Sequence, residues 1–360
     1  MRRRALLGLI IGALALALVL WDVPLAEVGA ALAGARLRYL IPITLLFYLQ
    51  QSIRALRQSL LLHDASERGE PIGFRASLSV LCISFLFINS LPARVGEVVR
   101  PTLLWERHGV PIGRGAAMVI VERFLDLASA VAMVALVAVL VPTPSREIVV
   151  SGYHVDWVEL GRVATMTVFP ALLAAMAALL IAGRPVLRLL ARFEPRMPAF
   201  TRRFMRLGLG FAGGFVSGLE SISSPRRLLA VLALTALTWS LSGWMYVSAA
   251  YAFGLEHLIG YGEGVGLLSI TMLGTAIPSA PGMAGTYEAF LRGGLALFGA
   301  GGSALAGTAV AYALTYHWWL YFSQAATALF FLTVDQVSPS ALYHKAMASW
   351  RRAGAEGEAH

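Results

Sequence analysis

The chain alternates long apolar runs with short polar breaks from residue 5 to residue 334. A helix that crosses a membrane needs about 20 apolar residues. Five runs reach that length and are predicted as spanning helices: 39–62, 116–141, 163–182, 228–250 and 304–333. Residues 5–20 form a slightly shorter sixth run. We interpret it as an uncleaved first span rather than a signal peptide, because the chain continues with further spans.

Two more apolar runs, 76–88 and 264–277, are too short to cross. The first is followed by a break at Pro92, and the second ends at a break around Pro278 and Pro281. Runs of this length are more typical of re-entrant or interfacial helices than of spans. The pattern therefore predicts an all-α polytopic membrane protein with eight hydrophobic segments, six of them full spans and two of them re-entrant helical hairpins.

The arginines predict how these segments are oriented. Nine arginines lie between residues 183 and 227, and cytoplasmic loops carry the excess of arginine and lysine. That loop is cytoplasmic only if residues 76–106 enter the membrane and return to the same side. The same alternation makes 264–299 enter from the outside and places both termini in the cytoplasm of a bacterial-type cell membrane.

The two hairpins also resemble each other in sequence. Pro92 and Gly96 are four residues apart, as are Pro281 and Gly285, and Glu97 or Glu288 follows. Because the hairpins enter from opposite faces, the match predicts an inverted repeat, a design in which transporters bind substrate near the membrane midplane.

Composition agrees with one membrane domain, residues 1–335, and a cytoplasmic tail, residues 336–360. Hydrophobic residues make up 58% of the 360 and charged residues 14%, whereas soluble domains carry about a quarter charged residues. The net charge of +9 comes from arginines between apolar runs, which indicates topology and anionic lipid rather than nucleic acid. The single Cys82 excludes an internal disulfide and a multi-cysteine metal site, and we expect no metal or cofactor.

The break after 76–88 carries candidate chemistry. Pro92 ends the incoming helix, and Gly96 permits the turn into a return helix whose free N–H groups face the membrane interior. Together with Arg94 these groups form an anion site suited to phosphate. Each buried charge costs about 2.5–3.5 kcal/mol in a bilayer, so a protein-lined cavity is required. The alternative is an ion-pair network at the cytoplasmic surface. The candidates of this hairpin are Asn89, Pro92, Arg94, Gly96, Glu97 and Arg100.

Three further places carry polar groups inside apolar runs. Glu122 and Asp126 share a helical face, and Arg123 is three residues from Asp126. With Arg54 they are candidate substrate contacts, and the alternative is a salt bridge to Arg54, Arg57 or the first hairpin. Glu288 follows Gly285, where it either couples transport to protons or caps its own helix. His317 is a ligand, a relay or a packed core residue. No metalloprotease or hydrolase pattern is present, so we expect that the chain is not an enzyme.

Three blocks in order, "LPARVGEVVRPTLL", "VERFLDL" and "PSAPGMAGTYEAFL", resemble the lysylphosphatidylglycerol synthase transmembrane family, also called the flippase-like or uncharacterised protein family 0104. The resemblance implies a lipid-translocating domain, here of the stand-alone kind without a synthase. Met283 and Ala284 depart from the Gly-rich continuation usual in the third block. The matched positions are Pro92, Arg94, Gly96, Glu97, Glu122, Arg123, Asp126, Pro281, Gly282, Gly285 and Glu288.

We therefore expect a flippase or transporter that moves a phosphate-bearing phospholipid or glycolipid between leaflets, with the headgroup between the two hairpins. The alternatives are a membrane-embedded enzyme using Glu97, Glu122 or Asp126, or a non-catalytic scaffold of a lipid-modification pathway. Expected partners are anionic phospholipid, glycolipid or polyprenyl lipid. A separately encoded lipid-synthesis enzyme and a homo-oligomer are both compatible with the sequence.

The inward return of the first hairpin is testable because the chain has one cysteine. In a Cys82→Ser background, Arg107→Cys should stay unlabelled when intact cells are treated with an external, membrane-impermeant thiol reagent. Strong labelling at that position would place residue 107 outside and overturn the predicted topology.

Overall fold

The computed structural model describes residues 10–63 (without 11, 18 and 22), 66–67, 71–90, 96–141, 147–150, 153–198, 224–275 and 280–356, together with the single positions 202, 205, 206, 209 and 213. All structural statements below concern these residues. The predicted site residues Pro92 and Arg94 lie outside them.

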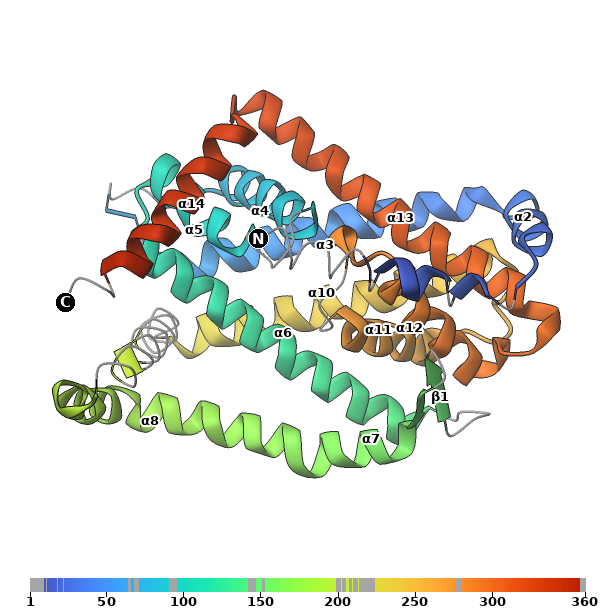
Figure 1. The fold of residues 1–360 in the computed structure, drawn as a ribbon, viewed down its shortest axis with the longest axis horizontal. Coiled ribbons are helices and arrows are strands. Elements are labelled where there is room, and N and C mark those ends of the chain that lie inside the picture. Colours follow the sequence, from blue (N-terminus) through green and yellow to red (C-terminus); the bar gives the residue numbers. More distant parts are fainter. Residues whose placement is uncertain are drawn as a thin grey trace.

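Helices carry almost the whole described fold, as Figure 1 shows. The helices are α2 (Leu25–Ala33), α3 (Leu40–Leu61), α4 (Phe74–Ser90), α5 (Gly96–His108), α6 (Ile112–Leu140), α7 (Trp157–Val163), α8 (Phe169–Phe193), α10 (Pro225–Ala252), α11 (Tyr261–Thr275), α12 (Thr286–Leu295), α13 (Ser303–Val334) and α14 (Pro339–Glu356). Short 3₁₀ or π segments are η1 (Leu37–Tyr39), η3 (Ala164–Val168), η4 (Glu194–Arg196), η5 (Pro281–Met283) and η6 (Ala296–Ala300).

One small β-hairpin interrupts the helices between α6 and α7. Its strands β1 (Glu147–Val150) and β2 (Tyr153–Asp156) are antiparallel, with Glu147 opposite Asp156. We did not predict these strands, since four-residue strands leave little periodic signal beside long apolar runs. The all-α class is otherwise confirmed.

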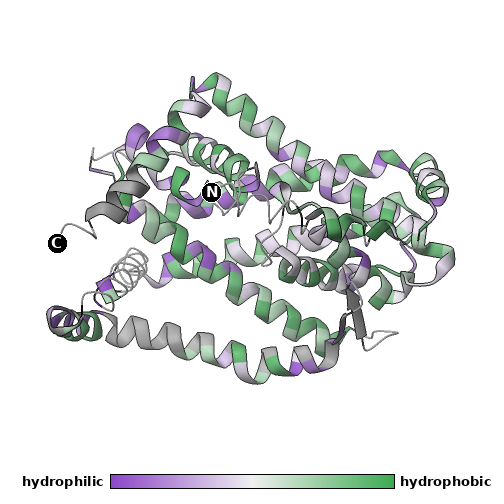
Figure 2. Cartoon of the chain, in the orientation of Figure 1, coloured by the Kyte–Doolittle hydropathy of each residue, from purple (hydrophilic) through white to green (hydrophobic). Residues whose placement is uncertain are grey.

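All five runs predicted as spans are helical, in α3, α6, η3 with α8, α10 and α13. By length and hydropathy two of the described helices, α6 and α10, can cross a membrane unaided, and α2 with η1–α3 adds a third candidate as a pair bent by 74°. The protein is therefore a membrane protein. Figure 2 shows long hydrophobic stretches along α6 and α10.

Helix α13 is the longest helix of the described chain, with 32 residues, but its middle is less apolar. Tyr316, His317 and Gln324 are buried there. Polar groups at the centre of a long apolar helix face the protein interior rather than lipid, because lipid offers them no partner. Helix α13 thus brings polar chemistry to the middle of the molecule.

The two short apolar runs form two helical pairs. Helix α4 packs against α5, and α11 packs against α12, with the breaks 91–95 and 276–285 between them. The broken ends meet at α13. Helix α4 contacts η5, the Ser90 hydroxyl lies 3.3 Å from the Tyr321 hydroxyl, and a Cβ built on Gly282 would lie 3.1 Å from the Tyr321 ring.

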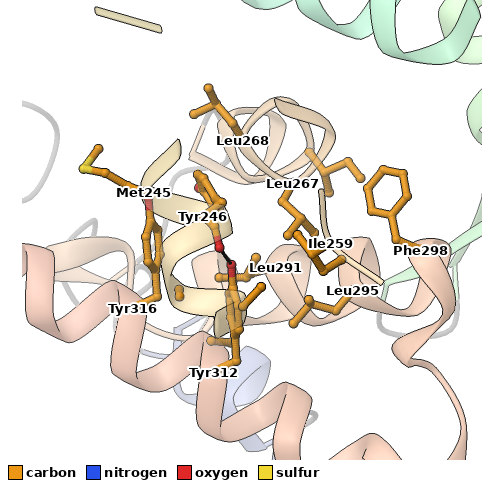
Figure 3. Close-up of a cluster of buried hydrophobic side chains, with 14 of the residues drawn as sticks. Met245, Tyr246, Ile259, Leu267, Leu268, Leu291, Leu295, Phe298, Tyr312 and Tyr316 are labelled. Carbon is orange, nitrogen blue, oxygen red and sulfur yellow. Dashed lines mark hydrogen bonds between the residues drawn. The ribbon is translucent and has the colours of Figure 1, made fainter. Parts of the chain in front are cut away.

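A packed core surrounds the second pair, as Figure 3 shows. Leu267 from α11 and Leu291 and Leu295 from α12 are completely buried. The Tyr312 hydroxyl donates to the backbone oxygen of Tyr246 at 2.7 Å, which joins α13 to α10. This hydrogen bond holds two long helices in register beside the hairpin.

Gly285 is required by the backbone at the start of α12. Its φ of 85° is left-handed, and a Cβ there would lie 2.1 Å from the backbone oxygen of Gly12. Gly12 belongs to the helical residues 12–17, which precede α2 and which we call the first helix. Only glycine combines that φ with so close an approach. The first helix therefore packs directly against Gly285, at the start of α12.

Gly285→Ala should destabilise the protein by about 1–3 kcal/mol, because the new methyl group strains the backbone and pushes the first helix away. Unfolding can be followed by heating with a thiol-reactive fluorophore, since the buried Cys82 reacts only when the fold opens. Gly113→Ala is the matched control, because a Cβ there meets nothing within 4 Å. Equal midpoints for both variants would contradict this role of Gly285.

Candidate functional site: a buried arginine cluster and a glutamate–histidine pair

The C-terminal half of α3 presents polar side chains to the protein interior. Gln50, Gln51, Arg57 and Gln58 are all buried, and Arg54 is half-buried. Arg54 is three or four positions from each of the others, so these residues lie along one side of α3 and form a polar stripe on an otherwise apolar helix. This stripe lies against α10, α4 and α13.

Arg57 joins three helices. Its Nη1 and Nη2 lie 3.2 Å from Asp126 Oδ1 on α6, and Nη1 donates to the Thr235 hydroxyl on α10 at 3.1 Å. Arg57 Nε lies 3.8 Å from Glu122 Oε1. Only 2% of the Arg57 side chain is exposed, so the pairing replaces the solvation that burial removes.

Arg100 fixes the return helix of the first pair to the same cluster. Its Nη1 donates to Glu122 Oε2 at 2.5 Å, and its Nε donates to Gln58 Oε1 at 2.8 Å. A second Arg100 nitrogen also contacts that Gln58 oxygen. The structure therefore brings Arg100 and Glu122, which the sequence placed in separate motifs, into one buried ion pair.

Positive charge exceeds negative charge in this cluster, which we call the arginine cluster: Arg54, Arg57, Arg100, Arg123, Glu122 and Asp126. Arg123 Nη2 lies 3.3 Å from Asp126 Oδ2. Arg54 makes no ion pair among the described residues; its guanidinium lies 5.6 Å from the ring of Phe85 and 5.5 Å from that of Trp239. Four arginines against two carboxylates leave a net charge of +2.

The cluster lies deeper than the sequence indicated. Helix α6 begins at Ile112, four residues before the predicted span, so Glu122 is ten residues, or about 15 Å, along it. Thr235 is also ten residues from the start of α10. Glu122 and Thr235 therefore lie well within the length of α6 and α10 and not at their ends.

The remaining candidates of the first pair lie around its break. Asn89 is half-buried in the last turn of α4, Gly96 begins α5, and Glu97 is half-buried in the first turn of α5. Arg100 is one turn further along. A helix does begin at Gly96, where the sequence predicted the turn after the break.

In the second pair Glu288 is fully buried and both its oxygens have partners. Oε2 accepts from the backbone N–H of Gly285 at 2.7 Å, as a helix cap, and Oε1 lies 2.8 Å from His317 Nδ1 on α13. Pro281 and Gly282 form η5 just before it, with Gly282 at a φ of 71°. Capping and contact with His317 occur together, where the sequence left them as alternatives.

Aromatic residues hold His317 in place. The Tyr287 ring stacks on the imidazole with centroids 4.2 Å apart and planes at 18°. The Tyr287 hydroxyl lies 2.7 Å from the Tyr246 hydroxyl, which lies 2.6 Å from the Thr271 hydroxyl. These contacts fix the imidazole plane from α12, α10 and α11.

Buried amides connect the two places. Gln51 Nε2 donates to Gln324 Oε1 at 2.5 Å, and Gln324 Nε2 donates to the backbone oxygen of Cys82 at 3.2 Å. On α13, His317, Tyr321 and Gln324 follow at four- and three-residue spacing and so share a face. A row of polar groups thus runs from the arginine cluster to Glu288.

Sequence reasoning missed several members of this site. Arg57 was named only as a salt-bridge partner, and Gln58, Thr235, Gln324 and Tyr287 were not named. The polar spacing on α3 was a usable signal for Gln58, whereas the others depend on which helices become neighbours. In the described part of the chain no three His, Cys, Asp or Glu side chains group to hold a metal ion.

The fold and the site define a helical membrane protein with a buried, net positive polar centre. The chain belongs to the lysylphosphatidylglycerol synthase TM region family, whose model matches residues 5–323. The resemblance drawn from the three sequence blocks is thereby confirmed. The family ties the protein to membrane lipids and their modification, which is consistent with lipid partners.

A curated relative is "Glycosyltransferase AglD" of Haloferax volcanii, 27% identical over 298 residues. The match covers 78% of this chain and 47% of the relative, so the chain spans about half the length of that protein. No solved structure matches the chain. The relative is named for a group-transfer reaction, and this contradicts our expectation that the chain is not an enzyme.

The excess positive charge predicts unequal effects for two substitutions in the cluster. Glu122→Gln leaves Arg100 buried without its carboxylate and should cost about 3–5 kcal/mol of stability. Arg123→Gln removes one excess charge from a side chain that is 39% exposed, and should cost less than about 1 kcal/mol. The thiol-fluorophore unfolding of Cys82 measures both. A larger loss for Arg123→Gln would show that the charge balance is misassigned.

Proposed function

We propose that the protein moves a phosphate-bearing lipid between the membrane leaflets and binds the lipid phosphate at the arginine cluster. The observation that carries the proposal is the net charge of +2 of the arginine cluster, in which the half-buried Arg54 makes no ion pair among the described residues. Buried charge without a counterion is costly, and a lipid phosphate of charge −1 or −2 would supply the counterion.

Arg54 has the right surroundings for this role. Its guanidinium lies close to the aromatic rings of Phe85 and Trp239, and its Nε has no hydrogen-bond partner. A guanidinium binds phosphate through its N–H edge, often with two parallel bonds. The rings favour the cation and hold it in place, so its donors remain available to an incoming anion.

The start of α5 supports the same assignment. The N-terminus of a helix carries free N–H groups and a positive dipole end, which attract phosphate. This end begins at Gly96, one turn from the buried Arg100. We include Arg94 and Pro92 in the proposed site on the basis of the family blocks alone.

We further propose that the headgroup passes along the row of polar groups between the two hairpins. Gln51, one turn before Arg54 on α3, donates to Gln324 on α13, the helix of His317, and Tyr321 lies where the broken helix ends meet. In this arrangement the hairpins are re-entrant from opposite faces, the repeat is inverted and both termini are cytoplasmic. Each hairpin then serves the headgroup from one leaflet.

A second candidate function is glycosyl transfer to a lipid phosphate. It is favoured by the name of the curated relative, which the chain covers to 47% of its length. The arginine cluster would bind the acceptor phosphate in the same way. Product formation from nucleotide sugars and a panel of lipid phosphates would separate this function from translocation, which leaves the lipid unchanged.

Translocation can be measured in vesicles that hold trace fluorescent phosphatidylglycerol or polyprenyl phosphate, with dithionite quenching the outer leaflet. The wild-type protein should speed the loss of protected signal over empty vesicles. Arg54→Gln should slow the lipid exchange about 10- to 100-fold, because the loss of one hydrogen bond to a charged group weakens binding by about that factor.

Arg36→Gln is the matched control. Arg36 lies in the loop between α2 and α3, outside the arginine cluster, and forms an ion pair at 2.9 Å with Glu256 in the loop between α10 and α11. It should exchange lipid at the wild-type rate. A wild-type protein no faster than empty vesicles with every phosphate-bearing lipid would refute translocation. Normal exchange by a folded Arg54→Gln variant would refute the binding site.

A further inference from the structure

The carboxylates of the protein interior are balanced in two different ways. Glu122 and Asp126 face arginines, which stay charged at all accessible pH values. Glu288, in contrast, makes no ion pair with arginine or lysine in the described chain, and its side-chain partner is His317, whose Nδ1 lies 2.8 Å from Glu288 Oε1. Histidine is the side chain whose charge changes near neutral pH. The second hairpin therefore pairs its buried carboxylate with an imidazole, where the first pairs its carboxylates with arginines.

Among the described groups around Glu288, His317 is the one that forms an ion pair with its carboxylate when protonated. Helix α13 contributes Tyr312, Tyr316 and Tyr321 near the pair, α12 contributes Tyr287 and Arg292, and α10 contributes Tyr246. Arg292 Nη1 donates to the backbone oxygen of Val19 at 2.8 Å. From α11 the nearest polar group in this network is the Thr271 hydroxyl, and described positions 12–17 of the first helix carry no ionisable side chain.

The geometry also says where a proton enters. Glu288 is fully buried, while 10% of the His317 side chain is exposed. Nδ1 of His317 is committed to Glu288, and Nε2 makes no hydrogen bond within the described chain. Stacking on Tyr287 keeps the ring in this orientation. A proton from water can therefore add at Nε2, which changes the pair from a carboxylate with neutral imidazole, charge −1, to a carboxylate with imidazolium, charge 0.

We propose that Glu288 and His317 form a proton site that couples proton movement to the passage of the lipid phosphate. With a charge of −1 the pair repels a phosphate that moves along the polar row from Gln324 toward His317. Uptake of one proton at Nε2 removes this repulsion and lets the headgroup pass. Loss of the same proton from Nε2 on the other side resets the pair. This inference rests on the proposed translocation and adds one co-transported proton for each lipid.

The test is a shift in the steady-state distribution of a lipid, which an uncoupled pathway cannot produce. Vesicles with trace fluorescent phosphatidylglycerol, whose phosphodiester keeps a single charge, receive a gradient of one pH unit, while potassium and valinomycin clamp the membrane potential. With one proton per lipid, the leaflet ratio should move about tenfold toward the alkaline side. An entrapped pH dye should report proton entry that depends on the lipid.

Two variants separate the proton site from a structural role. Glu288→Gln keeps an acceptor for the Gly285 N–H but cannot carry the charge, and His317→Gln removes the titratable group. Each should equilibrate the lipid to the same ratio with and without the gradient. Glu256→Gln is the matched control, because that carboxylate pairs with Arg36 in a loop, and it should keep the wild-type response.

The outcomes distinguish this inference from the function beneath it. Wild-type protein that moves lipid to a ratio unaffected by the gradient overturns the proton site and leaves translocation standing. A Glu288→Gln variant that keeps the tenfold response also overturns the proton site and leaves translocation standing. Wild-type protein that moves no lipid of the panel overturns both. A gradient response in wild type that is lost in either variant supports the proton site.

Discussion

Charge buried in an apolar surrounding must find its partners inside the protein, and the arrangement of the first hairpin depends on this constraint. Arg57 and Arg100 meet Asp126 and Glu122 across α3, α5 and α6. Removing one partner leaves an uncompensated charge, so these helices hold one relative position. The apolar contacts around Leu103 and Val121 fill the space, but similar side chains could pack in many ways. The ion pairs select one.

The second hairpin solves the same problem with weaker and adjustable groups. Its carboxylate receives a backbone N–H from Gly285 and an imidazole from α13, and no arginine. Glycine at position 285 lets the first helix approach, which shields the carboxylate from lipid. The two helical pairs thus balance their buried carboxylates differently: the first pairs them with arginines, and the second pairs Glu288 with a backbone N–H and an imidazole.

The sequence predicted the helices and the breaks, because apolar run length and proline position are local properties. It also predicted the family, since three ordered blocks are specific together. It did not predict that Arg100 pairs with Glu122, or that Glu288 meets His317, because these contacts join residues 22 and 29 positions apart on different helices. The expectation of no enzyme was wrong because the absence of a familiar catalytic pattern is a weak argument. A relative about twice as long as the matched region is named for a transferase reaction.

The excess charge of the arginine cluster is the part of the site that stability does not explain. Buried ion pairs are often no better for stability than well-packed apolar residues of similar volume. Balanced pairs can still specify a helix arrangement, and Arg57 with Asp126 is such a pair. Arg54 specifies nothing of this kind, since it has no carboxylate partner in the described chain and lies beside two aromatic rings. A cation without a carboxylate partner can be balanced by a ligand of opposite charge. Because the chain belongs to a lipid-related family, we propose that this ligand is the phosphate of a lipid.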